Sequence, residues 1–217
     1  MTPIEQLKKD IATFRRLDKR HRWLFIWDYY RIPIISVLII AAIGAAVAFG
    51  VMRDDKDLYI VMVNANREVE VESVPKQLEK NGIDLAGMKI DVETSYTLKY
   101  EDFTQADVQT VEVLAVRFGI GDLDVFAADE PVFRSYAEKD AFVDLSLFIP
   151  KDVLGSKEAD LYRYRNSDGH EIVGGIWLRK GSPLHEAGLY SGDVLIGVAA
   201  LAENLDNALL FIRNFFD

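Results

Sequence analysis

Residues 58–65 read LYIVMVNA, and this short apolar run opens the pattern that decides the fold. A run of this length, rich in β-branched residues, is typical of a buried strand. Residues 88–98, MKIDVETSYTL, alternate apolar and polar side chains as a second strand does. Residues 123–128, LDVFAA, form a third apolar run. We therefore expect three strands in the region that follows residue 57.

Helical patterns fill the two intervals between these runs. Residues 68–81 place Pro75 in a first helical turn and Asn81-Gly82 as a stop signal. Residues 106–118 have the spacing of a second helix. Because strands and helices alternate, the expected fold class is α/β, with a parallel or mixed sheet covered by helices.

The same pattern continues to the end of the chain. Asp129 is placed to cap a helix with Pro131 in its first turn, and residues 140–149 carry a short hydrophobic segment. The turn signal at 166–169, flanked by residues 161–165 and 171–178, predicts a β-hairpin. Residues 194–200 read as a last buried strand, and Asn204 is placed to cap a final helix that docks on the sheet.

Upstream, residues 32–52 read IPIISVLIIAAIGAAVAFGVM without a charge. As a helix this run spans roughly 31 Å, which matches the hydrocarbon thickness of a bilayer. Eight basic and four acidic residues precede it, which leaves 17 basic and 31 acidic residues after it. The positive-inside rule then predicts a single-pass protein of the cell membrane, with a cytoplasmic N-terminus and an extracytoplasmic C-terminal domain. A cleavable signal peptide and a buried core helix are the alternatives.

Four segments follow from this topology: a cytoplasmic basic leader (1–31), a transmembrane helix (32–52), a linker (53–57) and an extracytoplasmic α/β domain (58–217). In the leader, apolar residues share one face of an amphipathic helix: Ile4, Leu7, Ile11, Phe14 and Leu17. That helix is expected either on the anionic inner leaflet or against a partner protein or its own copy.

The composition gives few signs of catalysis. The chain has no cysteine, which excludes disulfides and thiolate sites. His21, His170 and His185 lack the spacing of metal ligands, so we expect no metal, no cofactor and no enzymatic activity. A net charge of −14 after the span argues against nucleic acid as a partner. The expected partners are the lipid bilayer and an envelope protein or transporter.

Two longer stretches carry a family resemblance. GIGDLDVFAADEPVFRSYAEKDAFVDLSLFI (119–149) resembles the segment of bacterial extracellular solute-binding proteins in which a helix, a "G-x-x-D-v" strand, a loop, a "f-x-x-y" helix and a "f-x-D-L" run follow one another. VLIGVAALAENLDNALLFIRNFF (194–216) is similar to the strand and helix with which those proteins return to their first lobe. An "N-x-D/E-x-A-x-x-F" pattern there matches Asn204, Asp206, Ala208 and Phe211.

This resemblance implies one lobe of the type II solute-binding fold. Full-length members have two α/β lobes that close on a ligand, and the second lobe falls between the two matched stretches. Here only about 45 residues, Pro150–Asp193, occupy that interval. A lipoprotein anchor would also need a cysteine, which the chain lacks. We therefore expect a membrane-anchored, single-lobe relative with a β-hairpin elaboration and without a closing cleft.

Open α/β sheets bind ligands beyond the carboxyl ends of their strands. The candidate residues for ligand or partner contact there are Asn64, Asn66, Tyr96, Asp129, Glu130 and Trp177. Such residues also serve as turn formers, caps and packing residues, so both interpretations stay open. Two functions fit: a non-catalytic interaction or accessory module that contacts an envelope protein, and a receptor for a sugar or peptide that feeds a transporter or sensor.

Overall fold

Three parallel strands form one half of the sheet. The computed structural model describes residues 56–99 and 103–216. In it, β1 (Leu58–Met62) lies between β2 (Ile90–Glu93) and β3 (Val125–Ala128), with Leu58 aligned to Ile90 and Ile60 to Val125. Every residue of β1 and β3 is buried, as is typical of parallel strands covered on both faces.

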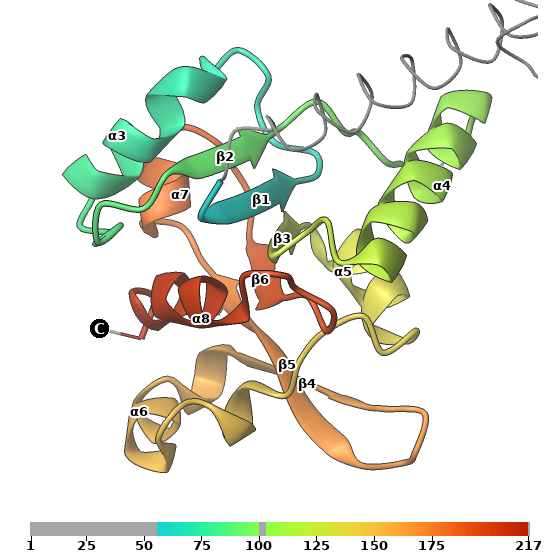
Figure 1. Ribbon diagram of the computed structural model, residues 1–217, viewed down its shortest axis with the longest axis vertical. Coiled ribbons are helices and arrows are strands. Elements are labelled where there is room, and N and C mark those ends of the chain that lie inside the picture. Colours follow the sequence, from blue (N-terminus) through green and yellow to red (C-terminus); the bar gives the residue numbers. More distant parts are fainter. Residues whose placement is uncertain (1–55, 100–102, 217) are drawn as a thin grey trace, which may run out of the picture. The chain divides into compact units, whose positions relative to one another are not determined.

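Helices α3 and α4 connect these strands and cover opposite faces of the sheet (Figure 1). α3 (Val74–Lys80), after the 3-10 turn η1 (Val71–Ser73), joins β1 to β2. α4 (Gln105–Ile120) joins β2 to β3. The chain therefore moves from β1 to β2 on one side of it, and then crosses back to β3 on the other side of β1. The direction of winding thus reverses between β1 and β3.

The ends of both helices follow from their sequence. α3 has Pro75 in its first turn and ends at Asn81, before Gly82 with φ of +94°. Thr104 caps α4 through a reciprocal capping box with Asp107. α4 stops at Gly121, whose φ of +74° and close approach to the Leu201 carbonyl leave no room for a side chain.

The other half of the sheet is antiparallel. β6 (Val194–Val198) lies beside β3, followed by β5 (Glu171–Leu178) and β4 (Leu161–Arg165), which gives a six-stranded mixed sheet in the order β2-β1-β3-β6-β5-β4. The predicted hairpin is confirmed. Its turn is closed by the side-chain oxygen of Asn166, which accepts from the His170 N–H at 2.8 Å.

Shorter elements complete the domain. They are α5 (Glu130–Ala137), η2 (Leu145–Leu147), α6 (Lys151–Ser156), η3 (Glu158–Asp160), α7 (Pro183–Glu186) and α8 (Leu205–Arg213). α8 packs on the same face of the sheet as α3, and α5 packs on the same face as α4. The predicted final helix therefore docks on the sheet as expected.

Each face of the sheet has its own apolar core. On the α4 side the core is largely aromatic, and the rings of Phe133 and Phe142 stack at 4.1 Å between centroids. A Cβ at Gly175 or Gly197 would approach the Phe133 ring to 2.8 or 2.9 Å. These two glycines in the central antiparallel strands therefore make room for the ring stack.

Three local predictions are corrected. The strand expected at 88–98 ends at Glu93, because the chain then turns to hydrogen-bond with Asn64 instead of continuing along β1. Asp129 and Asn204 occupy the N-cap positions of α5 and α8, but neither side chain caps its helix. Asp129 instead accepts from Asn64, and Asn204 donates to Asp124.

Residues 56–217 form a compact unit of their own. The predicted leader, the predicted span at 32–52 and most of the linker lie outside the described residues. Within the described ranges, none of the helices combines the length and the apolar character needed to cross a bilayer.

Candidate functional site

The carboxyl ends of β1 and β3 meet at the point where the winding of the chain reverses. In open α/β sheets, this topological switch point is where ligands bind, because the loops leaving the two strands diverge to opposite faces. Asn64 follows β1 and Asp129 follows β3. The amide nitrogen of Asn64 lies 2.9 Å from Oδ1 of Asp129, so the two side chains meet across the switch point.

A pocket of about 520 Å³ opens beside this pair. Three of the six predicted site residues line it, together with a loop that precedes β6. The lining residues are Asn64, Asn66, Asp129, Gly188, Leu189, Tyr190, Ser191, Gly192 and Asp193. A volume in this range fits a small organic molecule.

Asn64 is held in an unusual backbone conformation. Its φ of +59° lies in the left-handed region, which asparagine tolerates better than most residues. Its side chain exchanges two hydrogen bonds with the backbone of Leu98, at 2.8 and 2.9 Å, and its N–H donates to the Tyr96 carbonyl at 2.9 Å. These bonds fix the amide that meets Asp129.

Asp129 is a half-buried carboxylate beside the pocket. Burial raises its pKa above the usual value of an aspartate, and the hydrogen bond from Asn64 opposes that shift. Among the described residues that line the pocket, none is Lys, Arg or His. Asp129 is thus partly desolvated, and its partner in the pocket wall is a neutral amide.

Tyr190 is the aromatic residue of the pocket wall. Its hydroxyl lies 2.9 Å from the Val63 carbonyl and 3.1 Å from the Ala127 carbonyl, so its one proton is shared between the ends of β1 and β3. Burial raises the pKa of this phenol well above its usual value. Tyr190 therefore joins the two strands at the base of the switch point as a neutral donor.

The loop 188–193 is fixed from two sides. Asn66 donates its N–H to the Leu189 carbonyl at 2.8 Å and its side-chain amide to the Gly188 carbonyl at 3.2 Å. On the other side, His185 Nε2 lies 2.7 Å from the Gly192 carbonyl and Nδ1 lies 2.7 Å from Ser182 Oγ. A tautomer protonated at Nε2 donates to Gly192 and accepts from Ser182.

The contact between Ser182 and His185 pairs a hydroxyl with a potential base. Ser182 is the N-cap residue of the short helix α7 and His185 lies three residues later within it, and the second ring nitrogen lies beside a backbone carbonyl. This geometry anchors the pocket loop, and we assign the pair that role.

The other three predicted site residues lie outside the pocket lining. The side chain of Tyr96 packs on the core on the α4 side, and Glu130 forms an ion pair with Arg134 one turn later in α5. Trp177 lies on β5, where its ring meets Tyr162 edge-on at 6.4 Å and Arg179 lies 5.7 Å above it. Tyr96 and Trp177 thus make packing contacts, whereas Glu130 is held in an exposed ion pair.

Sequence reasoning missed the loop 188–193. Leu189 is buried and Gly188 has φ of +74°, but neither feature marks a pocket in the sequence. The available signal was the glycine pair, Gly188 and Gly192, around Tyr190-Ser191 just before a buried strand. A polar loop of this kind beside a predicted switch point is a candidate wall.

The residues 56–99 and 103–216 contain no group of three or more acidic or histidine side chains able to hold a metal ion. Two carboxylates, Asp129 and Asp193, line the pocket. No protein-family model, curated protein or solved structure matches this chain.

Proposed function

We propose that the domain is a non-catalytic binding module whose switch-point pocket takes a small polar ligand. In this proposal the span at 32–52 holds the domain on the extracytoplasmic side of the cell membrane, where it serves as a receptor subunit for a transporter or sensor. The observation that carries the proposal is the pocket of about 520 Å³ between the carboxyl ends of β1 and β3.

The fold supports the single-lobe part of the proposal. The resemblance to solute-binding proteins implies a final strand and helix that return to the first lobe, and β6 and α8 pack on the same sheet as β1. The interval in which a second lobe would fall folds mainly into α6, the hairpin β4-β5 and α7. A ligand would therefore bind on one lobe, in an open pocket.

The test is calorimetric titration of the full-length chain in lipid nanodiscs with amines, sugars, amino acids and short peptides. We expect saturable binding of one class. Gly192→Leu should abolish this binding, because Gly192 lines the pocket and a leucine side chain there would fill it. The substitution should leave the fold intact, since a Cβ at Gly192 meets no atom within 4 Å. Gly155→Leu is the matched control, since a Cβ at Gly155 in α6 also meets nothing within 4 Å.

The proposal fails if no ligand in the panel binds. It also fails if Gly192→Leu binds the ligand as tightly as the natural chain, because the binding would then lie elsewhere.

A second candidate function, an interaction module, is favoured by the outer face of α4. Val113, Val116 and Ile120 are 43, 59 and 71 % exposed. With two further exposed residues they recur at alternating spacings of three and four: Ala106, Gln109, Val113, Val116 and Ile120, here called the α4 seam. This is the a/d spacing by which one helix packs lengthwise on another.

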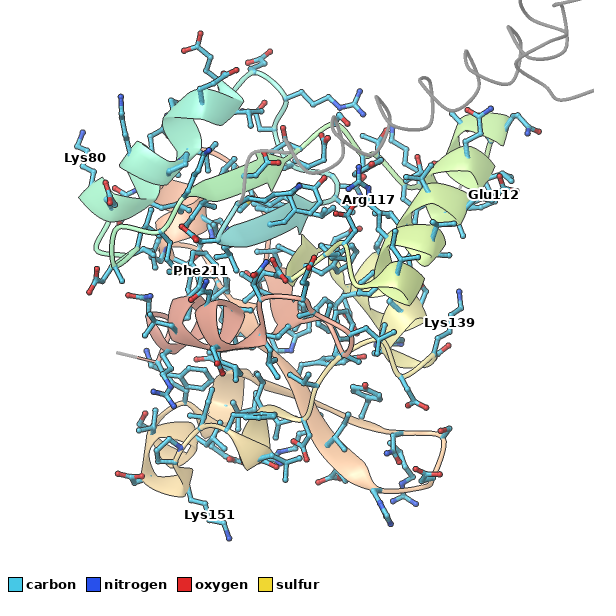
Figure 2. The ribbon with its side chains drawn as sticks, viewed as in Figure 1. Lys80, Glu112, Arg117, Lys139, Lys151 and Phe211 are labelled. Carbon is cyan, nitrogen blue, oxygen red and sulfur yellow. The ribbon has the colours of Figure 1, made fainter. Side chains whose placement is uncertain are left out.

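We assign a second copy of this chain as the occupant of the α4 seam, because a seam with heptad spacing is complementary to itself. Gly119 lies beside the seam, and a Cβ there meets no atom within 4 Å. A glycine inside a helix destabilises it by about 0.5–1 kcal/mol relative to alanine. Close packing of a second helix would account for Gly119, because a residue without a side chain lets two helices approach. Figure 2 shows Glu112 pointing away from the sheet beside this face and Arg117 pointing toward the sheet.

Disulfide cross-linking tests the second candidate, because the natural chain contains no cysteine. Val116→Cys in the full-length chain should form a cross-linked dimer on oxidation, whereas Ser167→Cys in the hairpin turn should not. Equal cross-linking of the two variants, or none of Val116→Cys, would rule out self-association through the seam.

A further inference from the structure

Several hydrogen-bond donors of the pocket wall hold the pocket together. The amide of Asn64 donates to the Leu98 carbonyl and to Asp129, at 2.9 Å each. The amide of Asn66 donates to the Gly188 carbonyl, and the hydroxyl proton of Tyr190 is held by the two strand carbonyls. A ligand that needs donors from Asn64 or Tyr190 would have to break bonds that hold the pocket together.

The carboxylate of Asp129 keeps unused acceptor capacity. A carboxylate offers about four lone-pair positions, and Asn64 uses one of those on Asp129. At the rim, Asp193 pairs with Arg179 at 3.0 Å, and the same guanidinium also pairs with Asp160 at 3.0 Å. Asp129 has no such cation among the residues that line the pocket. The pocket therefore combines negative charge with unused acceptor capacity.

From this imbalance we infer that the ligand carries a protonated amino group that lies against the Asp129 carboxylate. The inference rests on the proposed ligand-binding function and names the chemical class of the ligand. A primary ammonium has three donors and no acceptor, which complements a carboxylate with unused lone pairs. A hydrogen bond between two charged groups is also roughly twice as strong as one between neutral groups.

Other ligand classes fit this wall less well. A neutral sugar hydroxyl can donate to Asp129, but it brings no charge that balances the carboxylate. A carboxylate or phosphate ligand would be repelled by Asp129. A bare metal ion needs several protein ligands, and the described residues bring no group of three together. An organic amine satisfies Asp129 with a single contact and leaves the remaining volume for the body of the molecule.

Two matched pairs of probes isolate the amine. Glucosamine and glucose differ at one position of the same ring, and 1,4-diaminobutane and 1,4-butanediol differ only at their ends. In calorimetric titrations of the full-length chain in neutral-lipid nanodiscs, we expect each amine to bind roughly 10- to 100-fold more tightly than its neutral partner.

Two variants locate the contact. Asp129→Asn should remove the 10- to 100-fold higher affinity for the amines, because the charge is lost. The asparagine oxygen can still accept the hydrogen bond from Asn64. Asp168→Asn in the exposed hairpin turn removes an equal charge away from the pocket and should leave the affinity unchanged. If Asp129→Asn does not fold, Gly192→Leu provides the independent test, since it fills the pocket and keeps Asp129.

The outcomes separate this inference from the proposed function. Binding of the neutral partners as tightly as the amines would overturn the inference and leave a ligand-binding pocket in place. An equal loss in Asp129→Asn and Asp168→Asn would show attraction to the net charge alone and would also overturn it. Binding of none of the four probes, when another neutral sugar does bind, would overturn it too. Absence of binding by every compound would overturn both.

Discussion

Two aspartates at opposite ends of β3 have opposite surroundings. Asp124, at the start of the strand, is 2 % exposed and accepts from the Tyr59 N–H at 2.8 Å and from the backbone and side chain of Asn204 at 2.9 and 3.2 Å. Asp129, at the other end, is half-buried beside the pocket and meets the amide of Asn64. The first carboxylate has its partners inside the fold, and the second has capacity left for a ligand.

This difference separates a closed edge of the sheet from one that borders an open pocket. At the amino edge, Asp124 joins β1, β3 and the start of α8. At the carboxyl edge, the same two strands are joined by the hydroxyl of Tyr190 and by Asn64, and the space beyond them is open. Rigid support at one edge holds the strands in place, so the other edge can remain open for binding.

The largest expected effect is the loss of Asp124. Asp124→Ala leaves the Tyr59 N–H and two donors of Asn204 without an acceptor in a buried site, which should lower the free energy of unfolding by about 3 kcal/mol. Asp129→Ala should lower the free energy of unfolding by less than about 1 kcal/mol, because that carboxylate is partly exposed. Urea unfolding measures both. Equal costs for the two alanine variants would remove the distinction between the edges.

Asn64 is expected to give the next largest effect. Asn64→Ala loses both hydrogen bonds with Leu98 and places alanine at φ of +59°, so we expect a loss of about 2–3 kcal/mol. Asn64→Gly loses the same hydrogen bonds, but glycine adopts this positive φ without strain. The glycine variant should therefore be about 1 kcal/mol more stable than the alanine variant. The reverse order in urea unfolding would mean that backbone strain at Asn64 is negligible.

Tyr190→Phe should have a smaller effect, about 1 kcal/mol, because only the hydroxyl shared by Val63 and Ala127 is lost. The same variant tests the raised pKa of this phenol. An alkaline absorbance titration of the folded chain should show the same number of ionising tyrosines up to about pH 11 in both proteins. If one fewer tyrosine ionised in Tyr190→Phe than in the natural chain, Tyr190 would have a pKa in the ordinary range.

The sequence predicted most of the fold because its strands are marked by local signals. β1, β3 and β6 are short apolar runs, and the hairpin turn has Asn166 and Gly169 at the positions that close it. Each signal acts within a few residues. The order of strands and the antiparallel direction of β6 depend on contacts far apart in the chain, which local periodicity does not encode.

The candidate site was only partly predictable for the same reason. Asn64, Asn66 and Asp129 follow strand ends, so the switch-point rule located them. The wall they share with residues 188–193 is made by segments more than 50 residues apart, and no local motif reports that contact. Asp129 and Asn204 were read as caps, but each side chain found a partner 65 or 80 residues away. Long-range hydrogen bonds thus replaced the local ones that propensity favours.

The smallest expected effect is the pH dependence contributed by Asp129. The folded-state pKa is raised, mainly by burial, whereas the carboxyl of an unfolded chain ionises near pH 3.9. The folded protein therefore keeps this proton to higher pH than the unfolded chain does. The stabilising contribution is complete below about pH 3.9 and is lost as the pH rises through the folded-state pKa.

Asp129→Asn cannot ionise and should lack this dependence. The free energy of unfolding of the natural chain minus that of the variant should therefore decrease between about pH 4 and pH 7, by less than about 1 kcal/mol because the group is partly exposed. An amine bound against the carboxylate would favour its charged form, so a saturating amine should weaken or reverse the decrease. A difference that grows with pH in the ligand-free chain would mean that the fold already stabilises the charge of Asp129, and the contrast with Asp124 would be lost.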